Sequence, residues 1–230
     1  MRAAVALACL LFVALDTCAS ASAPLPPPKR PPTPSPAGLV PLPCDGSEPL
    51  RPAHGTYCLT DRHYVTPQTR DAIVRAARAV HKAYPDTVVT FMDASWPSGK
   101  KPFPPHLSHG DGRQIDLALF YESKDGRRLP KPPGSINGYE DFEPRPAGEP
   151  DPCPGRWKHR RPDPPTTRTW RLDEARSELL TRTLIKEKAV RRVLIEPHLE
   201  KRFGLWGNAK ARFQGCYAAR HDDHLHVDFN

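Results

Sequence analysis

The chain has 230 residues, of which 38% are hydrophobic and 30 are proline, and its formal net charge at pH 7 is +8. A basic protein attracts anionic partners. The basic residues are scattered, however, and no aromatic side chains are interleaved with them, which disfavours nucleic acid as a partner. A solvated basic surface that only maintains solubility is the alternative for any one cluster.

The N-terminal residues predict export. Met1 and Arg2 precede an apolar run over residues 3–15 and small residues at 19–23, which is typical of a secretory signal peptide cleaved after Ala21. The run is too short to span a bilayer comfortably, so we expect no stable membrane span once it is removed. A periplasmic or secreted location follows, where cell-wall polymers and lipopolysaccharide are the anionic partners at hand. The oligomeric state is left open.

Four cysteines stay in the exported chain: Cys44, Cys58, Cys153 and Cys216. An even number in an oxidising compartment predicts two disulfides, and the sequence leaves all three pairings open. There is no Cys-x-x-Cys pair, so cysteine metal ligands are disfavoured. Cys216 is the one candidate, because it shortly precedes His221.

The predicted organisation begins with the signal peptide at 1–21 and a proline-rich linker at 22–43 without apolar periodicity. A single domain follows at 44–230. Thr66 and Pro67 are a good helix start, and the apolar spacing predicts a helix over 67–84. Residues 87–92 are β-branched and aromatic, which favours a strand.

A second strand is expected at 114–120, with Ile115, Leu117 and Leu119 on one face and Asp116 on the other. Residues 122–169 are rich in proline and glycine and predict a long surface loop, stapled in part through its cysteine. The remaining expected elements are a helix over 172–188, a buried strand over 190–195, a short helix over 197–203 and a strand over 223–229. Alternation in this last strand places His224, His226 and Asp228 on one face.

Five histidines and one aspartate form two motifs that are typical of a metal site. They are His109-x6-Asp116 with His106 before it, and His221-x-x-His224-x-His226. Three protein ligands with one open position are the mark of catalytic zinc, because the fourth position holds water. We expect His109, Asp116 and His226 to bind one Zn²⁺ per chain. Adventitious or purely structural metal binding is the alternative.

The remaining histidines of the motifs have predicted catalytic roles. Because side chains in a strand repeat their direction every two residues, His224 lies beside His226 and is positioned as the general base. His106 and His221 are expected to line the cleft as hydrogen-bond donors or auxiliary bases. Gly110 and Gly112 are expected to let the backbone turn before the strand.

These residues carry a resemblance to a known family. The segments His106-Leu107-Ser108-His109-Gly110-Asp111-Gly112-Arg113-Gln114-Ile115-Asp116 and His221-Asp222-Asp223-His224-Leu225-His226-Val227 resemble the penicillin-insensitive murein endopeptidases, in the lysostaphin, D-Ala-D-Ala metallopeptidase and hedgehog fold group. The resemblance extends from about residue 86 to 230 and is strong at the two motifs. It implies an α+β fold around a small antiparallel sheet, with flanking helices and long Pro/Gly-rich loops. It also implies zinc ligation by His109, Asp116 and His226, catalysis by His224 with support from His106 and His221, and hydrolysis of D-alanyl to meso-diaminopimelyl cross-links between peptidoglycan stem peptides.

Two other functions are weighed beside the endopeptidase. Related D,D-carboxypeptidases and dipeptidases carry a glutamate three residues before their His-x-His pair, where this chain has His221, although Asp222 and Asp223 leave a carboxylate base as an alternative. A non-catalytic wall-binding module that keeps its zinc as a structural relic is the rival from another class.

Overall fold

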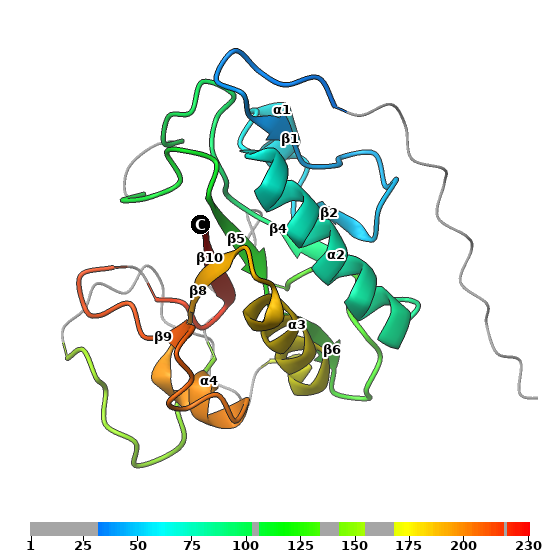
Figure 1. The fold of residues 1–230 in the computed structure, drawn as a ribbon. Coiled ribbons are helices and arrows are strands. Elements are labelled where there is room, and N and C mark those ends of the chain that lie inside the picture. The colour runs from blue at the N-terminus through cyan, green and yellow to red at the C-terminus, as the bar shows by residue number, and fades with distance from the viewer. Residues whose placement is uncertain (1–31, 103–105, 134–142, 155–167, 219) are drawn as a thin grey trace, which may run out of the picture.

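The computed structural model describes residues 32–102, 106–133, 143–154, 168–218 and 220–230 (Figure 1). The predicted signal peptide and residues 22–31 of the predicted linker lie outside these ranges. Four helices and several small sheets are present in the described residues, and the expected α+β fold is confirmed. None of the helices among them is both long and apolar enough to cross a membrane.

A six-stranded sheet runs through the middle of the fold in the order β2-β4-β5-β10-β8-β9. Its four central strands are antiparallel, while each edge strand is parallel to its neighbour. The expected antiparallel sheet is therefore found at the centre, with a parallel strand added on each side. The strands are β2 (Leu50–Pro52), β4 (Val89–Phe91), β5 (Gln114–Ala118), β10 (His224–Phe229), β8 (Val190–Leu194) and β9 (Ala211–Arg212).

Two long helices, α2 (Pro67–Ala83) and α3 (Glu174–Lys186), cover one face of this sheet (Figure 1). Thr66 caps α2 by accepting a hydrogen bond from the Thr69 amide, and Pro67 occupies the first turn, as the sequence predicted. Asp173 caps α3 in the same way. This helix begins later than predicted, because Trp170–Leu172 form strand β7 instead.

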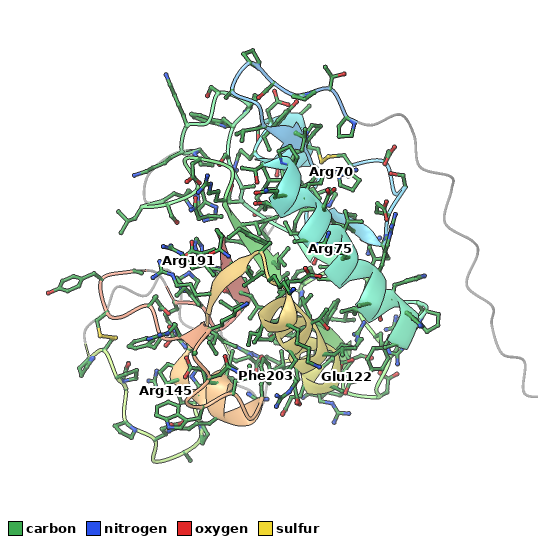
Figure 2. The ribbon with its side chains drawn as sticks, in the orientation of Figure 1. Arg70, Arg75, Glu122, Arg145, Arg191 and Phe203 are labelled. Carbon is green, nitrogen blue, oxygen red and sulfur yellow. A yellow bond between two sulfur atoms is a disulfide. The ribbon has the colours of Figure 1, made fainter. Side chains whose placement is uncertain are left out.

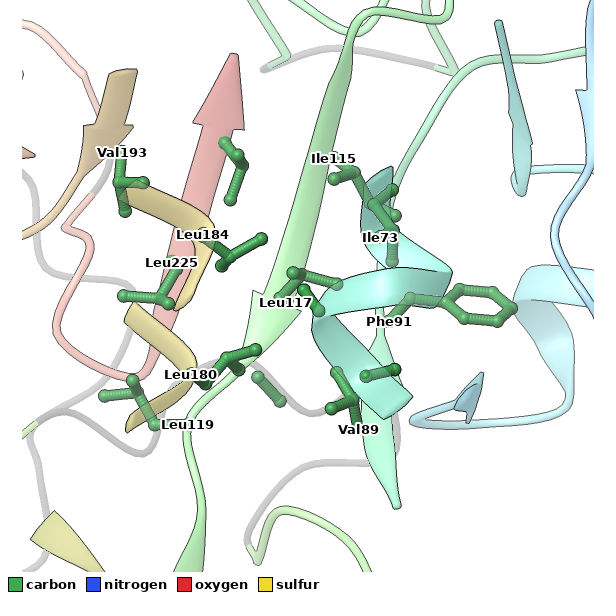
Figure 3. Packing of buried hydrophobic residues seen from close by; sticks show 14 of the residues in the cluster. Ile73, Val89, Phe91, Ile115, Leu117, Leu119, Leu180, Leu184, Val193 and Leu225 are labelled. Carbon is green, nitrogen blue, oxygen red and sulfur yellow. The ribbon is translucent and has the colours of Figure 1, made fainter. Parts of the chain in front are cut away.

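The hydrophobic core fills the layer between the helices and the sheet (Figure 3). Leu117 of β5 and Leu225 of β10 point into this layer, toward Ile73 of α2 and Leu180 of α3, and all four are at most 1% exposed. Because side chains alternate along a strand, the neighbouring residues of β5 and β10 point to the opposite face of the sheet. That opposite face carries Asp116, His224 and His226 of the predicted site.

Several short elements complete the fold: β1 (Val40–Pro41), α1 (Thr56–Leu59), β3 (Tyr64–Val65), β6 (Tyr121–Ser123), β7 (Trp170–Leu172) and α4 (Pro197–Arg202). Strand β1 lies inside the predicted linker and pairs with β3. Leu39, Val40 and Leu42 are buried beside it. The folded region therefore begins before Cys44, because these three side chains supply apolar surface to the core within a proline-rich stretch.

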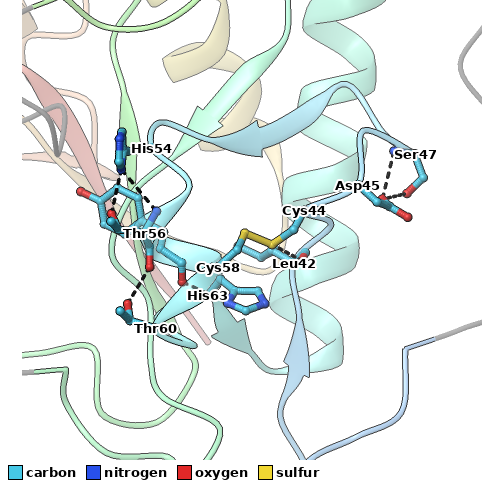
Figure 4. Close-up of a disulfide and its surroundings, with 10 residues drawn as sticks. Leu42, Cys44, Asp45, Ser47, His54, Thr56, Cys58, Thr60 and His63 are labelled. Atoms are coloured by element: carbon cyan, nitrogen blue, oxygen red, sulfur yellow. Dashed lines mark hydrogen bonds between the residues drawn. A yellow bond between two sulfur atoms is a disulfide. The ribbon is translucent and has the colours of Figure 1, made fainter.

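Two disulfides, Cys44–Cys58 (Figure 4) and Cys153–Cys216, select one of the three possible pairings. Disulfides persist in oxidising compartments, so the pairs fit a secreted or periplasmic protein. The second disulfide also confirms that the long loop is stapled. The base of this loop is closed by β6 and β7, which pair antiparallel from Tyr121↔Leu172 to Ser123↔Trp170.

Candidate metal centre

Three histidines gather around one carboxylate on the sheet face away from the helices. The register of β5 and β10 places His226 directly opposite Asp116. The Asp116 Oδ1 atom lies 2.9 Å from His226 Nδ1, 3.4 Å from His109 Nε2 and 3.9 Å from His224 Nε2. All four residues are at most 5% exposed. Two segments more than a hundred residues apart in sequence therefore meet at a single oxygen atom.

The spacing of these donors suits a metal ion. A tetrahedral ion with bonds of about 2.0–2.1 Å to nitrogen and oxygen separates two of its ligand atoms by about 3.3–3.4 Å. The distance from His109 Nε2 to Asp116 Oδ1 is 3.4 Å, and the distance from His226 Nδ1 to the same oxygen is somewhat shorter. Two imidazole nitrogens and a carboxylate oxygen are also the donor types that bind transition-metal ions. The residues present fit such an ion.

Two of these histidines, His226 and His224, each contact a further carboxylate through the ring nitrogen that faces away from Asp116. Asp228 Oδ1 is 3.3 Å from His226 Nε2, and Asp223 Oδ1 contacts His224 Nδ1. Because an ionised carboxylate only accepts hydrogen bonds, His226 Nε2 and His224 Nδ1 are the donors in these pairs, and the other ring nitrogen of each histidine faces Asp116. A histidine whose second nitrogen is bound to a carboxylate is the usual arrangement around protein metal ions.

The backbone around His109 is held in an uncommon conformation. His109 has a φ of 68°, in the left-handed region that few residues other than glycine adopt. The Ser95 hydroxyl donates to the His109 carbonyl at 2.6 Å and accepts from the Gly112 amide at 2.8 Å, which fixes both ends of the turn. The prediction for Gly112 is confirmed by its φ of 74°, whereas the left-handed residue of the preceding turn is His109 and not Gly110.

Gly112 is also required for space. A Cβ atom at this position would lie 2.5 Å from Leu39 Cδ2 and 2.8 Å from the Thr66 amide nitrogen. The Thr66 amide in turn donates to the Gly112 carbonyl at 2.9 Å. Close backbone packing therefore connects the start of α2 to the turn that leads into β5.

Electrostatics within the centre reflect burial and mutual contact. Burial opposes ionisation of Asp116, but the nearby His109 and His224 outweigh it and hold its pKa well below the usual range. Burial likewise lowers the pKa of His226, but its hydrogen bonds to Asp116 and Asp228 outweigh that effect and raise the pKa to about 9. The pKa of His224 is raised, because Asp223 and Asp116 outweigh the effect of its burial.

Two histidines of the centre have depressed basicity. Burial lowers the pKa of His109, and it lowers the pKa of His221 still further, together with repulsion from His224 and His226. The Nδ1 atoms of both residues are buried and have no hydrogen-bond partner among the described residues. Neutral imidazoles with free lone pairs are therefore present in the site.

His106 and His221 adjoin the centre from its two sides. The His106 ring is 5.1 Å from the His109 ring, and the His221 ring is 4.9 Å from the His224 ring. His106 Nε2 lies 3.3 Å from buried Asp93, which also binds Arg62. The structure thus brings together all six predicted site residues.

A second choice of metal ligands is geometrically open. His106, His109 and Asp116 each place one ligand atom within 4.8 Å of the other two. His106 is therefore a competitor of His226 for the third ligand position. The carboxylate behind His226 and its direct contact with Asp116 favour His226. Another cluster contains Cys44, Cys58 and His63, but its two sulfurs are joined in a disulfide. Cys216 is also disulfide-bonded, so none of these cysteines is available as a metal ligand.

Sequence reasoning missed several supporting residues of the centre. Asp93 follows β4 and its backbone accepts from the Asp116 amide at 2.9 Å, and Glu196 accepts from the His221 amide at 3.3 Å. The alternation of β10 predicts the correct face for Asp228 but no role for it. A carboxylate two residues after the His-x-His histidine, on the same strand face, was the available signal. Asp93, Ser95 and Glu196 are far from either motif and offered none.

No protein family model matches this sequence, and no curated protein matches it either.

Proposed function

We propose that the protein is a zinc peptidase of the penicillin-insensitive murein endopeptidase type, exported to the periplasm or beyond. One observation carries the proposal: His109 and His226 each place a ring nitrogen beside the same Asp116 carboxylate oxygen, with His224 next to them. A zinc ion held there supplies a Lewis acid that polarises a peptide carbonyl and acidifies water toward a pKa of about 7.

In this proposal His224 moves the proton. Its Nδ1 is bound to Asp223, so its Nε2 is the nitrogen that takes a proton from the attacking water and passes it to the departing amine. Asp223 holds the ring in one tautomer, as the orienting carboxylate does in nucleophile and base pairs. His106 and His221 adjoin the centre and are positioned to donate hydrogen bonds to the carbonyl oxygen as charge develops on it.

The proposed substrate is the D-alanyl to meso-diaminopimelyl cross-link between peptidoglycan stem peptides. The motif resemblance supports this choice, and so does the basic net charge of +8, which suits an anionic wall polymer. The engagement of Asp223 with His224 supports an orienting role for this carboxylate and so favours the endopeptidase over a D,D-carboxypeptidase with a carboxylate base.

Digestion of purified sacculi tests the proposal. Dimeric muropeptides should be converted to monomers, and a chelator should abolish the conversion until zinc is restored. His224→Ala should retain one zinc per chain and its thermal stability while turnover falls by about 10²–10⁴-fold. His226→Ala should lose the metal. His54→Ala, a histidine outside the centre, is the matched control and should keep the zinc content and the turnover of the unchanged protein.

The alternatives give different products. A D,D-carboxypeptidase would leave dimers intact and release terminal D-alanine. A wall-binding module would bind sacculi with unchanged affinity in His224→Ala and release no product in any variant. Either result contradicts the proposal.

A further inference from the structure

A pocket of about 400 Å³ lies beside α4. Figure 2 shows Arg145, one of its lining residues, next to this helix. The volume falls within the range of about 300–1,000 Å³ that is common for small-molecule sites. Its walls are formed by Arg145, Glu149, Pro150, Pro152, Pro197, His198, Glu200, Lys201, Trp206 and Phe213.

Three buried polar atoms on residues that line this pocket have no hydrogen-bond partner among the described residues: the acceptors His198 Nδ1 and Glu200 Oε1, and the donor Arg145 Nε. His198 is 2% exposed and Glu200 is 6% exposed. His198 Nε2 lies 3.2 Å from the Glu143 carbonyl, which can only accept, so the ring proton is on Nε2 and Nδ1 offers a lone pair. A buried acceptor without a partner costs roughly 1–3 kcal/mol, which a ligand with hydrogen-bond donors would recover.

The charges around the pocket favour a neutral ligand. Burial raises the pKa of Glu200 to about 7 and lowers the pKa of His198 to about 4, so neither group carries a full charge near neutral pH. Lys201 is paired with Glu149, and Arg145 is paired with Asp151. Because both basic side chains are paired with carboxylates, the pocket presents no excess charge that would select an anion or a cation.

The rest of the lining is apolar and aromatic. Trp206 is 65% exposed and Phe213 lies in the same wall, together with three prolines. Lys201 Nζ lies 5.3 Å from the Trp206 ring centroid, and the indole still leaves most of its surface exposed. A pyranose ring matches these features, since it carries hydroxyl or amide donors on its rim and a C–H face that packs on an aromatic ring.

Neighbouring residues of the chain connect the pocket to the candidate metal centre. The Glu196 carboxylate accepts from the His221 amide, and the Glu196 amide donates to the His221 carbonyl at 3.0 Å. Pro197 and His198, the next two residues, line the pocket. A polymer with peptide side branches that reached both sites would place a peptide at the metal centre and its main chain in the pocket.

We propose that this pocket binds an N-acetylated amino sugar of the glycan strand while the attached peptide enters the metal centre. The assignment to murein glycan rests on the proposed function. The recognition of a sugar ring itself rests only on the acceptors and aromatic residues of the pocket.

Binding of a peptide-free probe tests this proposal. The tetramer of N-acetylglucosamine is titrated into the disulfide-bonded protein in the presence of chelator, so that neither metal nor cross-link contributes. The side-chain indole N–H signals of the four tryptophans are followed by NMR. The Trp206 signal, identified by its absence in Trp206→Ala, should shift with saturation in the millimolar range.

Substitutions localise the binding. Trp206→Ala should weaken it at least tenfold, and the isosteric Glu200→Gln at least threefold. Leu59→Ala, which truncates an 84% exposed apolar side chain on α1, should leave it unchanged. Denaturant unfolding of each variant checks that the fold is retained. No saturable binding, equal binding by Trp206→Ala, or tighter binding of tetramethylammonium than of the sugar overturns the proposal.

The two proposals fail separately. Sugar binding without hydrolysis of sacculi would remove the peptidase and keep the pocket as a glycan site. Hydrolysis with no effect of Trp206→Ala on sugar binding would keep the peptidase and remove the pocket.

Discussion

Asp228 controls how His226 presents its nitrogen atoms. It accepts from His226 Nε2 and also binds Arg191 and Arg192 from the adjacent strand β8. Burial opposes its ionisation, but these hydrogen bonds outweigh that effect and hold the pKa of Asp228 below the usual range. The carboxylate therefore stays charged and keeps the His226 Nδ1 atom directed at Asp116.

Asp228→Asn should weaken zinc binding by about 10–100-fold, the usual effect of removing a carboxylate behind a metal-binding histidine. Competition with a chromogenic chelator measures the affinity. Asp86→Asn, which alters an exposed pair with Arg128, is the control and should have no effect. Unchanged affinity in Asp228→Asn would show that His226 is not a ligand and would favour His106.

Metal binding should release protons at neutral pH. The pKa of His226 is about 9 without a metal ion, so its ring is protonated at pH 7 and must lose a proton before it can bind metal. The apparent affinity for the metal ion should therefore increase with pH up to about 9, and it should decrease as the pH is lowered from there. Titration calorimetry in two buffers of different ionisation enthalpy counts the protons. Zero release at pH 7 contradicts the assignment.

Among the secondary-structure elements, the turn before β5 is the most constrained. It holds a left-handed His109, a hydroxyl bridge from Ser95 and a glycine with no room for a side chain. The turn and the strand together place two of the proposed ligands, His109 and Asp116. Strain in the turn is compatible with a stable fold because its neighbours pack tightly on both sides.

Gly112→Ala should lower the free energy of unfolding by about 2–4 kcal/mol, since it adds a clash to the usual 1–2 kcal/mol cost of a left-handed alanine. Gly126→Ala is the matched control. Its φ is also positive, at 84°, but no atom lies within 4 Å of the added Cβ. Gly126→Ala should therefore lower the free energy of unfolding by only about 1–2 kcal/mol. Equal losses by urea denaturation would rule out the clash.

The elements that the sequence predicted well are those with local signals. Helix α2 has a capping threonine, a first-turn proline and regular apolar spacing, and strands β5 and β10 alternate cleanly. Strands β1, β3 and β9 have only two residues each, so their pairing is decided by distant partners. The proline-rich surroundings of Leu39 and Val40 predict a linker, although both side chains are buried. The motif histidines were found because strand periodicity brings His224 and His226 together.

For the molecule as a whole, the two disulfides connect segments at the periphery of the fold. Cys153–Cys216 joins two segments 63 residues apart and fixes the described part of the long loop beside the chain that leads to His221. Cys44–Cys58 joins segments only 14 residues apart, near α1. In the chain-entropy model the longer closure stabilises the fold by about 4 kcal/mol and the shorter one by about 3.

Replacing Cys153 and Cys216 together by serine should therefore lower the free energy of unfolding by about 1 kcal/mol more than replacing Cys44 and Cys58. Guanidinium unfolding of both double variants measures the difference. The reverse order would show that native packing around Cys44–Cys58 outweighs chain entropy.

The pairing of β6 with β7 brings Ser123 and Trp170 together at the foot of the intervening excursion. Because those ends already meet, the scaffold that holds the metal donors sets little limit on how many residues the excursion contains. The length of this loop could therefore vary between Ser123 and Trp170 without a change in the register of β5 and β10, which places His226 opposite Asp116.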